Sequence, residues 1–325
     1  MEKALNELKV EVIVRPLHPW RKLLTVVPRY LDLWHIRKFA RQRNISLIHC
    51  CDLWMSGYML RLARSLNIPS ILHVRIPVSP RDIRKFHCDS ATRIIAISKR
   101  IADNLILAGI SQDKVWQIDD GVDTEFFSPE KSRKNILREQ YSLDGQMLVG
   151  VVGRIDEFKR QLDFLKASRE VLKQRGNSVL FFVIGEVHSQ SYLNKMKNYI
   201  HEAGMENQVI LTDRRNDMPE VISSLDILVS LSGGSVMFEA MAAGKTVISA
   251  GFTPKKYSYH IQDGKTGFLI ESREPADLAE AIKKLIDSPH LRDEIGNNAR
   301  QWALKELTHT KMAQKTQQLY SDMLF

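Results

Sequence analysis

The chain has 325 residues, of which 44% are hydrophobic and 26% charged, and its formal net charge at pH 7 is +9. This length allows two domains of ordinary size, and the composition excludes a disordered or fibrous protein. The positive charge attracts phosphate-bearing partners such as nucleic acid, anionic lipid headgroups or nucleotide substrates, and does not choose among them.

The N-terminus and the cysteines indicate the compartment. No apolar run is long enough to span a membrane, and the first residues, MEKALNELKVEVIV, lack the charged, apolar and small-residue order of a signal peptide. A cytoplasmic location is therefore expected. The cysteines, Cys50, Cys51 and Cys88, form no CxxC pair, so reduced thiols are expected rather than a disulfide or a zinc site.

Short β-branched runs alternate with amphipathic helical patterns along the chain. In the first half, strands are predicted at residues 10–14, 46–50, 70–74, 93–97 and 114–118. After a turn-rich segment, further strands are predicted at residues 147–153, 179–185, 208–212, 226–231 and 246–250. Helices are predicted at residues 58–67, 99–109, 160–176, 191–204, 276–289 and 309–324. This alternation predicts an α/β fold with two parallel sheets.

The first candidate site is the segment GRIDEFKRQLDF, which follows a predicted strand. It begins with Gly153 and carries Arg154 and Lys159 at the mouth of a helix. Two cations at a helix start oppose the helix dipole, and a bound diphosphate would resolve that conflict. A solvated basic helix start that pairs with Asp156 and Glu157 explains the spacing equally well.

The second candidate site is the stretch SLSGGSVMFEAMAAGKTVIS. A compact turn of Gly233, Gly234 and Ser235 leads into a helix that begins near Val236 and carries Glu239 about one turn in. The Glu239 carboxylate can accept two hydrogen bonds from a vicinal diol such as a ribose. The alternative is a structural glutamate that complements the helix dipole.

Four segments taken together resemble a known family. In order and spacing, GRIDEFKRQLDF, VIGEV, DMPEVISSLDILVSLSGGSVMFEAMAAGKTVIS and DGKTGFLI are similar to successive signatures of the retaining glycosyltransferases of family 4, the glycosyl transferases group 1. In the first half, RIIAISKRIADNLILAGISQDKVWQIDDGVDTEFFSP resembles the end of the family's acceptor domain. Its Asp120-Gly121-Val122-Asp123 stands where the family has an Asn-Gly-Val-Asp turn.

The resemblance implies an α/β architecture of the GT-B type, with two Rossmann-like domains that face each other across a cleft. The acceptor-side domain is expected at residues 1–140 and the nucleotide-sugar domain at residues 141–305. A C-terminal helix in residues 306–325 is expected to cross back onto the first domain.

The resemblance also implies a donor, a sugar linked to UDP or GDP. Arg154 and Lys159 match the pair that neutralises the diphosphate, and Glu239 matches the glutamate that holds the ribose hydroxyls. The predicted donor-binding residues are Gly153, Arg154, Lys159, Gly233, Gly234, Ser235, Val236 and Glu239. The two cations would stabilise the charge that grows on the leaving nucleoside diphosphate. No DxD-type pair is apparent, so neither a metal nor another cofactor is expected.

Leu231 departs from the family pattern. Family members carry a further glutamate upstream of the one matched by Glu239, and Leu231 holds its position here. Either the loop is shorter and Ser232 or Ser235 takes over the role of that acid, or the choice of sugar differs, or activity is reduced.

The first domain departs from the family at its start. The family opens with a strand and a Gly-rich loop that faces the donor, whereas this chain opens with a segment similar to the end of the following helix. We expect that strand and loop to be missing, through truncation or a start codon assigned too late. Two residues are candidates for a catalytic role on the acceptor side: His73, in the predicted strand 70–74, and Arg75, directly after it. The alternative for His73 is an ordinary strand residue.

The segment HPWRKLLTVVPRYLDLWHIRKFARQRN mixes tryptophans with basic residues. In this family a surface of that kind can dock on an anionic membrane that carries a lipid-linked acceptor. The alternative is a set of helices that pack Trp and Leu inward and leave a solvated basic face.

These patterns predict a glycosyltransferase of the hexosyl type, which transfers a sugar to a glycan or lipid-linked acceptor with retention of configuration. It would serve polysaccharide or lipopolysaccharide biosynthesis in the cytoplasm, at the inner face of the membrane. The alternatives are a non-catalytic or impaired GT-B relative that acts as a binding subunit, and a sugar-nucleotide epimerase. Nucleic acid is not expected as a partner, because no recognition motif accompanies the charge.

Overall fold

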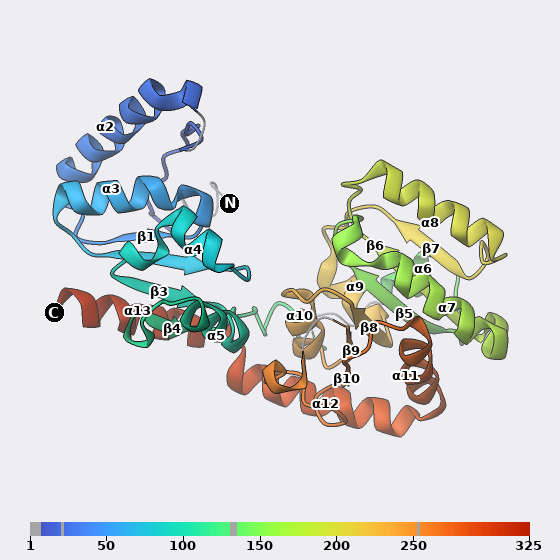
Figure 1. Cartoon of the computed structure of the whole chain (residues 1–325). Helices are drawn as coiled ribbons and strands as arrows, with labels where there is room; N and C mark the ends of the chain where they lie inside the picture. The colour runs from blue at the N-terminus through green and yellow to red at the C-terminus, as the bar shows by residue number, and fades with distance from the viewer. Residues whose placement is uncertain (1–7, 21–22, 131–134, 252–253) are drawn as a thin grey trace. The chain divides into compact units, whose positions relative to one another are not determined.

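The structure is a computed structural model that describes residues 8–20, 23–130, 135–251 and 254–325. The chain divides into two compact units (Figure 1). Unit 1 comprises Met1–Asp119 and Thr316–Phe325, and unit 2 comprises Asp120–Lys315. Each unit has its own parallel sheet. The domain boundaries expected from the sequence, at 140/141 and 305/306, stay predictions.

Unit 1 contains a four-stranded parallel sheet in the order β1-β2-β3-β4. The strands are β1 (Ile48–Cys50), β2 (Ser70–Val74), β3 (Arg93–Ala96) and β4 (Val115–Gln117). The helices are α2 (Val26–Gln42), α3 (Ser56–Leu66), α4 (Pro80–Phe86) and α5 (Lys99–Leu107), with 3₁₀ turns at Leu23–Thr25, Leu53–Met55, Cys88–Ser90 and Gln112–Lys114. Each strand lies within a run that the sequence predicts, and the apolar side chains of the central strands β2 and β3 are buried.

The strand predicted at residues 10–14 is wrong. These residues belong to no strand, and β1 pairs only with β2 in the described ranges. A strand is stable only when a neighbour takes up its backbone hydrogen bonds, and Val14 remains 74% exposed. The segment is held instead by Glu11, whose carboxylate accepts two hydrogen bonds from Arg43, just after α2.

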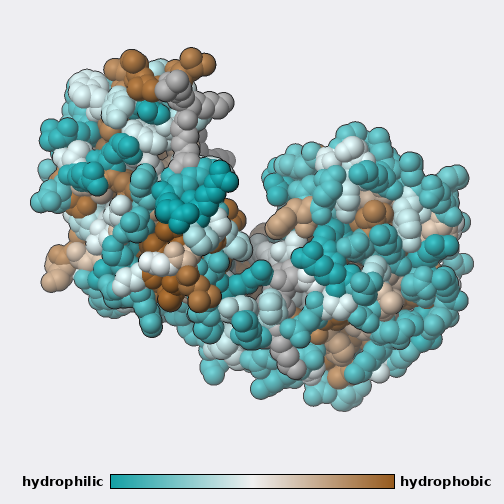
Figure 2. All heavy atoms as spheres, viewed as in Figure 1, coloured by the Kyte–Doolittle hydropathy of each residue, from teal (hydrophilic) through white to brown (hydrophobic). Residues whose placement is uncertain are grey.

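An exposed apolar row runs along α2. Val27, Leu31 and Trp34 are 69%, 55% and 56% exposed, and their spacing places them on one helix face. Figure 2 shows hydrophobic side chains gathered where α2 begins. Trp20 packs inward instead, with its ring centroid 4.9 Å from that of Tyr58. The inward packing expected of this segment therefore holds for Trp20 and not for Trp34. Among the helices in the described ranges, none is long and apolar enough to cross a membrane.

The last helix, α13 (His309–Leu324), ends in unit 1. Leu319 has no exposed surface, and the hydroxyl of Tyr320 lies 2.5 Å from Nδ1 of His49 on β1. The C-terminal helix therefore returns to the first sheet, as expected from the sequence (Figure 1).

Unit 2 contains a six-stranded parallel sheet in the order β10-β9-β8-β5-β6-β7. The strands are β5 (Met147–Val152), β6 (Val179–Ile184), β7 (Val209–Thr212), β8 (Ile227–Ser230), β9 (Thr246–Ala250) and β10 (Phe268–Ile270). The helices are α6 (Ile136–Gln140), α7 (Gln161–Arg175), α8 (Gln190–Glu202), α9 (Met218–Ser224), α10 (Val236–Ala242), α11 (Pro275–Asp287) and α12 (Pro289–Glu306), with 3₁₀ turns at Glu157–Lys159, Gly176–Ser178 and Lys255–Tyr257. Strand β10 is not among the predicted strands.

The order of strands in unit 2 reverses beside β5. The chain runs outward through β6 and β7, then returns to the other side of β5 with β8 and continues to β9 and β10. Open α/β sheets bind ligands outside the carboxyl ends of the strands at such a switch point. The segments that follow β5 and β8 are the two candidate sites of the sequence.

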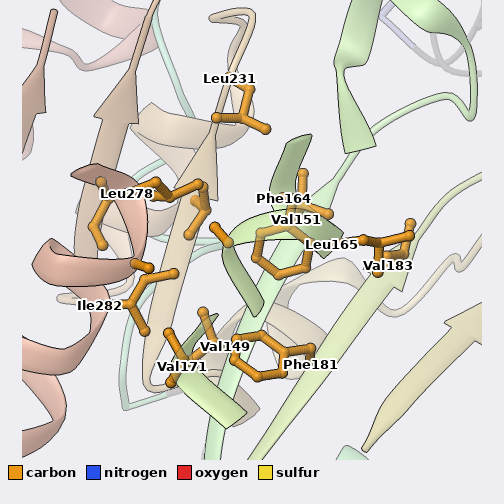
Figure 3. Packing of buried hydrophobic residues seen from close by; sticks show 14 of the residues in the cluster. Val149, Val151, Phe164, Leu165, Val171, Phe181, Val183, Leu231, Leu278 and Ile282 are labelled. Atoms are coloured by element: carbon orange, nitrogen blue, oxygen red, sulfur yellow. The ribbon is translucent and has the colours of Figure 1, made fainter. Parts of the chain in front are cut away.

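The core of unit 2 lies between the sheet and its helices. Phe164 of α7 and Phe181 of β6 are fully buried, with ring centroids 5.7 Å apart, and Ile282 of α11 belongs to the same cluster (Figure 3). Leu231, directly after β8, is also part of this cluster and only 3% exposed. The residue that the resemblance sets at the position of a family glutamate is therefore a core residue.

Candidate functional site

The loop after β5 has a backbone path that depends on glycine. Gly153 donates its N–H to the carbonyl of Ile184 at 2.9 Å, so this loop runs beside the end of β6. A Cβ added at Gly185 would lie 2.0 Å from the carbonyl oxygen of Gly153, closer than atoms can approach. The glycine at 185 thus permits the contact that holds the start of the GRIDEFKRQLDF segment.

Lys159 connects the two candidate segments. Its Nζ donates to the carbonyl of Gly233, in the turn after β8, at 3.4 Å. Its backbone N–H is capped by the side chain of Asp156 at 3.1 Å. Burial lowers the pKa of the Lys159 ammonium, and the charge of Arg154 lowers it further, against the opposing effect of Asp156. An ammonium has three hydrogen-bond donors. A bound anion would accept hydrogen bonds from them and offset the free-energy cost of burying the charge.

Arg154 is in an exposed position. Its side chain is 56% exposed, and its guanidinium lies 3.5 Å from the carboxylate of Asp156. The pairing with Asp156 that the sequence allows is therefore present. Such an exposed pair contributes little free energy, so a phosphate group could replace Asp156 as the partner of Arg154 at small cost.

The turn after β8 requires glycine at two positions. Gly233 and Gly234 have φ of 75° and 121°, values that residues with a Cβ adopt only with strain. The hydroxyl of Ser235 then donates to Oε1 of Glu239 at 3.1 Å. Burial raises the pKa of the Glu239 carboxyl, while the Ser235 hydrogen bond acts in the opposite direction. Glu239 is thus a half-buried acceptor beside the turn, and Val236 at the start of α10 packs partly against the core.

Ser232 and Ser235, the serines expected to take the role of the family's further glutamate, differ in position. The Ser232 hydroxyl is 3.5 Å from the carbonyl of Gly233, a long hydrogen bond, and Ser232 is half-buried. Ser235 is exposed and contacts Glu239. Leu231 is buried, so these two serines, with Lys159 and Glu239, are polar side chains that contact the turn.

Arg160 belongs to this site but is not among the predicted residues. Its backbone is left-handed, with φ of 58°, and its Nη1 lies 3.4 Å from the carbonyl oxygen of Leu231 and 3.3 Å from that of Gly251. Its Nε donates to Asp163 at 2.8 Å. Arg160 therefore ties the start of α7 to the carboxyl ends of β8 and β9. A second basic residue directly after Lys159 is the only sequence signal for it.

His73 and Arg75 lie in unit 1, apart from the unit that carries the donor candidates. His73 is half-buried on β2, and its ring stacks on that of His49 with centroids 5.3 Å apart. Burial, with the neighbouring charges of His49 and Arg75, lowers the pKa of His73 to about 4. Arg75 is exposed just after β2. The acceptor-side roles of both residues stay predictions.

Family models match both halves of the chain. The model of the glycosyl transferases group 1 matches residues 132–302, just over half of the chain. The model of glycosyltransferase family 4 matches residues 2–126.

Curated relatives are 24–29% identical to this chain over the aligned residues. The chain is 29% identical over 221 residues to the D-inositol 3-phosphate glycosyltransferase of Paenarthrobacter aurescens, an alignment that covers 65% of this chain and 53% of the relative. It is 24% identical over 245 residues to the capsular polysaccharide biosynthesis glycosyltransferase CapM of Staphylococcus aureus, with 72% and 62% covered. The chain thus spans less than two thirds of the length of these relatives.

Solved structures share the fold. Alr3699/HepE of Anabaena, in complex with UDP and glucose, superimposes with a TM-score of 0.85 at 21% identity, over 99% of this chain and 89% of that one. Sucrose-phosphate synthase of Thermosynechococcus elongatus gives a TM-score of 0.78 at 17% identity, over 96% and 82%. These matches show the GT-B fold. The family model that matches just over half of the chain shows that the chain belongs to the glycosyl transferases group 1 family.

Proposed function

We propose that this chain is a glycosyltransferase that moves a sugar from a nucleoside diphosphate donor to a glycan or lipid-linked acceptor with retention of configuration. The observation that carries the proposal is the contact between Lys159 and Gly233 at 3.4 Å, which joins the loops after β5 and β8 at the switch point of the sheet. A half-buried ammonium, two glycines and a half-buried carboxylate lie there.

Each group has a role that fits its surroundings. Lys159 and Arg154 would bind the diphosphate and stabilise the charge that develops on it as the bond to the sugar breaks. Glu239 would accept hydrogen bonds from the ribose hydroxyls, and the exposed Ser235 would turn from Glu239 toward the donor. These residues supply the positive charge themselves, so transfer would need no metal or other cofactor.

The nucleotide is proposed to be UDP, with GDP as the alternative. HepE, which shares the fold, was solved with UDP, with UDP and glucose, and with UDP-glucose. CapM, a relative by sequence, acts in capsular polysaccharide biosynthesis by its name, which supports a glycan or lipid-linked acceptor and a place in polysaccharide or lipopolysaccharide assembly. A hexose-type donor sugar is part of the proposal.

Titration calorimetry with UDP and GDP tests the donor site. We expect Lys159→Ala and Glu239→Ala to weaken binding about tenfold to hundredfold, since a hydrogen bond to a charged group contributes about 1.5–3 kcal/mol. The matched controls are Lys173→Ala and Glu170→Ala on α7, which pair with each other at 2.8 Å on an exposed surface. If neither nucleotide binds, or if the controls weaken binding equally, the proposal is wrong.

Product analysis separates the alternatives. A transferase needs both donor and acceptor, and the anomer of its product, read by NMR, reports retention. An epimerase converts the donor with no acceptor present. A non-catalytic binding subunit binds the nucleotide and yields no product with any acceptor.

We also propose a peripheral contact with the inner face of the membrane through α2. The exposed row of Val27, Leu31 and Trp34 lies on a helix with several basic side chains, the combination that binds anionic lipid surfaces. Cosedimentation with anionic vesicles should fall for Leu31→Ser with Trp34→Ser. It should stay unchanged for Trp54→Ser, which removes an equally exposed tryptophan, at 58%, from outside α2. Equal binding by both variants would exclude this surface.

A further inference from the structure

A cluster of histidine and cysteine side chains lies on the sheet of unit 1. His49 is on β1, Cys51 follows β1 directly, and His73 is on β2. The parallel register pairs Cys50 with Leu72, so Cys51 stands beside His73. Side chains along a strand alternate between the two faces, and His49, Cys51 and His73 therefore share one face while Cys50 points to the other.

The three side chains can offer their donor atoms to one point. One nitrogen of each imidazole and the sulfur of Cys51 all lie within 4.8 Å of one another. Bond lengths of about 2.0–2.3 Å place the donor atoms of a tetrahedral zinc site roughly 3.3–3.7 Å apart. Side-chain rotations that move each atom by about an ångström would therefore close the cluster around a metal ion.

Two nitrogens in the cluster are buried and unsatisfied. Nε2 of His49 and Nε2 of His73 are buried and make no hydrogen bond within the described ranges. Buried polar atoms almost always have a partner. Because two such atoms occur together beside a thiol, a single bound group could satisfy both.

His49 is also oriented in the manner of a metal ligand. Its Nδ1 lies 2.5 Å from the hydroxyl of Tyr320 on α13, which leaves Nε2 for a ligand. Metal-binding histidines are usually held by a hydrogen bond to the other ring nitrogen.

We propose that His49, Cys51 and His73 form a zinc-binding site, with Tyr320 as the positioning residue of His49. Nitrogen and thiolate donors favour Zn²⁺ over Mg²⁺ or Ca²⁺. The exposed Cys51 gives the ion a path from solvent, and three protein ligands leave a fourth position for water or another small ligand. The site lies in unit 1, and the proposed donor site lies in unit 2. In this state His73 is a metal ligand and cannot also accept a proton at Nε2.

Zinc titration of the full chain tests the proposal. The protein is prepared without an affinity tag, stripped with EDTA, dialysed, and titrated with Zn²⁺ against a competing chelator. We expect one equivalent to bind tightly, and Cys51→Ser and His73→Gln to lose this binding. Tyr320→Phe should weaken it about 10- to 100-fold. The matched controls are Cys50→Ser and His290→Gln, and both should bind Zn²⁺ as the wild type does. The Cys50 thiol donates to the Asp52 carbonyl, and His290 lies on α12.

Cobalt substitution reports the ligands directly. Co²⁺ bound at this site should show a thiolate-to-metal charge-transfer band that persists in Cys50→Ser and disappears in Cys51→Ser. The absence of stoichiometric Zn²⁺ binding by the wild type overturns the proposal, as does undiminished binding by both Cys51→Ser and His73→Gln. Thermal melts check that the variants fold. UDP binding is measured separately without zinc, so failure of the metal site and failure of the donor site are distinguishable.

Discussion

Replacement of Leu231 by glutamate tests whether the side chain at this position belongs to the hydrophobic core or to the donor site. A comparison of sequences alone would predict that Leu231→Glu restores a missing acid and improves the enzyme. The structure predicts a destabilised unit 2, because the leucine side chain is 3% exposed and lies in the main hydrophobic cluster (Figure 3).

The magnitude follows from what the substitution removes and adds. Truncation of a buried leucine costs about 2–5 kcal/mol, and glutamate retains part of the apolar stem. Its carboxyl must leave water, at a cost of about 1–3 kcal/mol when poorly paired. The Arg160 guanidinium, 3.4 Å from the Leu231 carbonyl oxygen, limits that cost. We expect a net loss of about 3 kcal/mol in the free energy of unfolding, which lowers the melting temperature by roughly 6–12 °C for a domain of this size.

Calorimetric melting of the wild type, Leu231→Glu and Leu231→Met provides the assay. The methionine variant keeps the volume and should lose less than about 1.5 kcal/mol. UDP-glucose turnover is recorded for all three. A glutamate variant that melts with the wild type and turns over faster would show that the side chain faces the donor, and the assignment of Leu231 to the core would be wrong.

Three further predictions concern the donor site and its support. Burial raises the pKa of Glu239 and lowers that of Lys159. UDP affinity should therefore fall at low pH, where Glu239 takes up a proton, and also at high pH, where Lys159 loses one. A Kd for UDP that is constant across the pH series would contradict both roles. Gly185→Ala should lower the free energy of unfolding by about 1–3 kcal/mol and weaken UDP binding, because its Cβ would lie 2.0 Å from the Gly153 carbonyl oxygen. Unchanged melting and UDP binding would show that the loop adapts and would contradict this prediction. Phe164→Ala, at a site with no exposed surface, should cost about 3–5 kcal/mol in denaturant unfolding, and Phe164→Leu clearly less.

The sequence predicts the central strands well because their side chains are buried on both faces of the sheet. The runs around Val149 and Phe181 are apolar throughout, and such runs have few alternatives to a central parallel strand. The run at residues 10–14 is also β-branched apart from Glu11, yet no strand lies beside it in the described ranges. A pattern shows that a segment can pair, while only the fold shows whether a partner is available.

Some residues of the candidate sites can be proposed from the sequence, and others depend on the fold. Lys159 and Glu239 could be proposed from the sequence because each follows a glycine turn at the end of a strand, and the carboxyl ends of parallel strands meet. Arg160 could not, since its role depends on a left-handed backbone and on carbonyls of two distant strands. The cluster of His49 and His73 depends on strand register and has no spacing signature.

Unit 1 is interrupted in the chain by the whole of unit 2. Its four strands are synthesised first, but Leu319 and Tyr320, which pack on it from α13, are synthesised after unit 2 is complete. On the ribosome, unit 2 therefore has all of its residues while the first sheet still lacks part of its cover. Contacts between residues so distant in sequence form slowly, and the open sheet is a surface on which chaperones can act and aggregation can start.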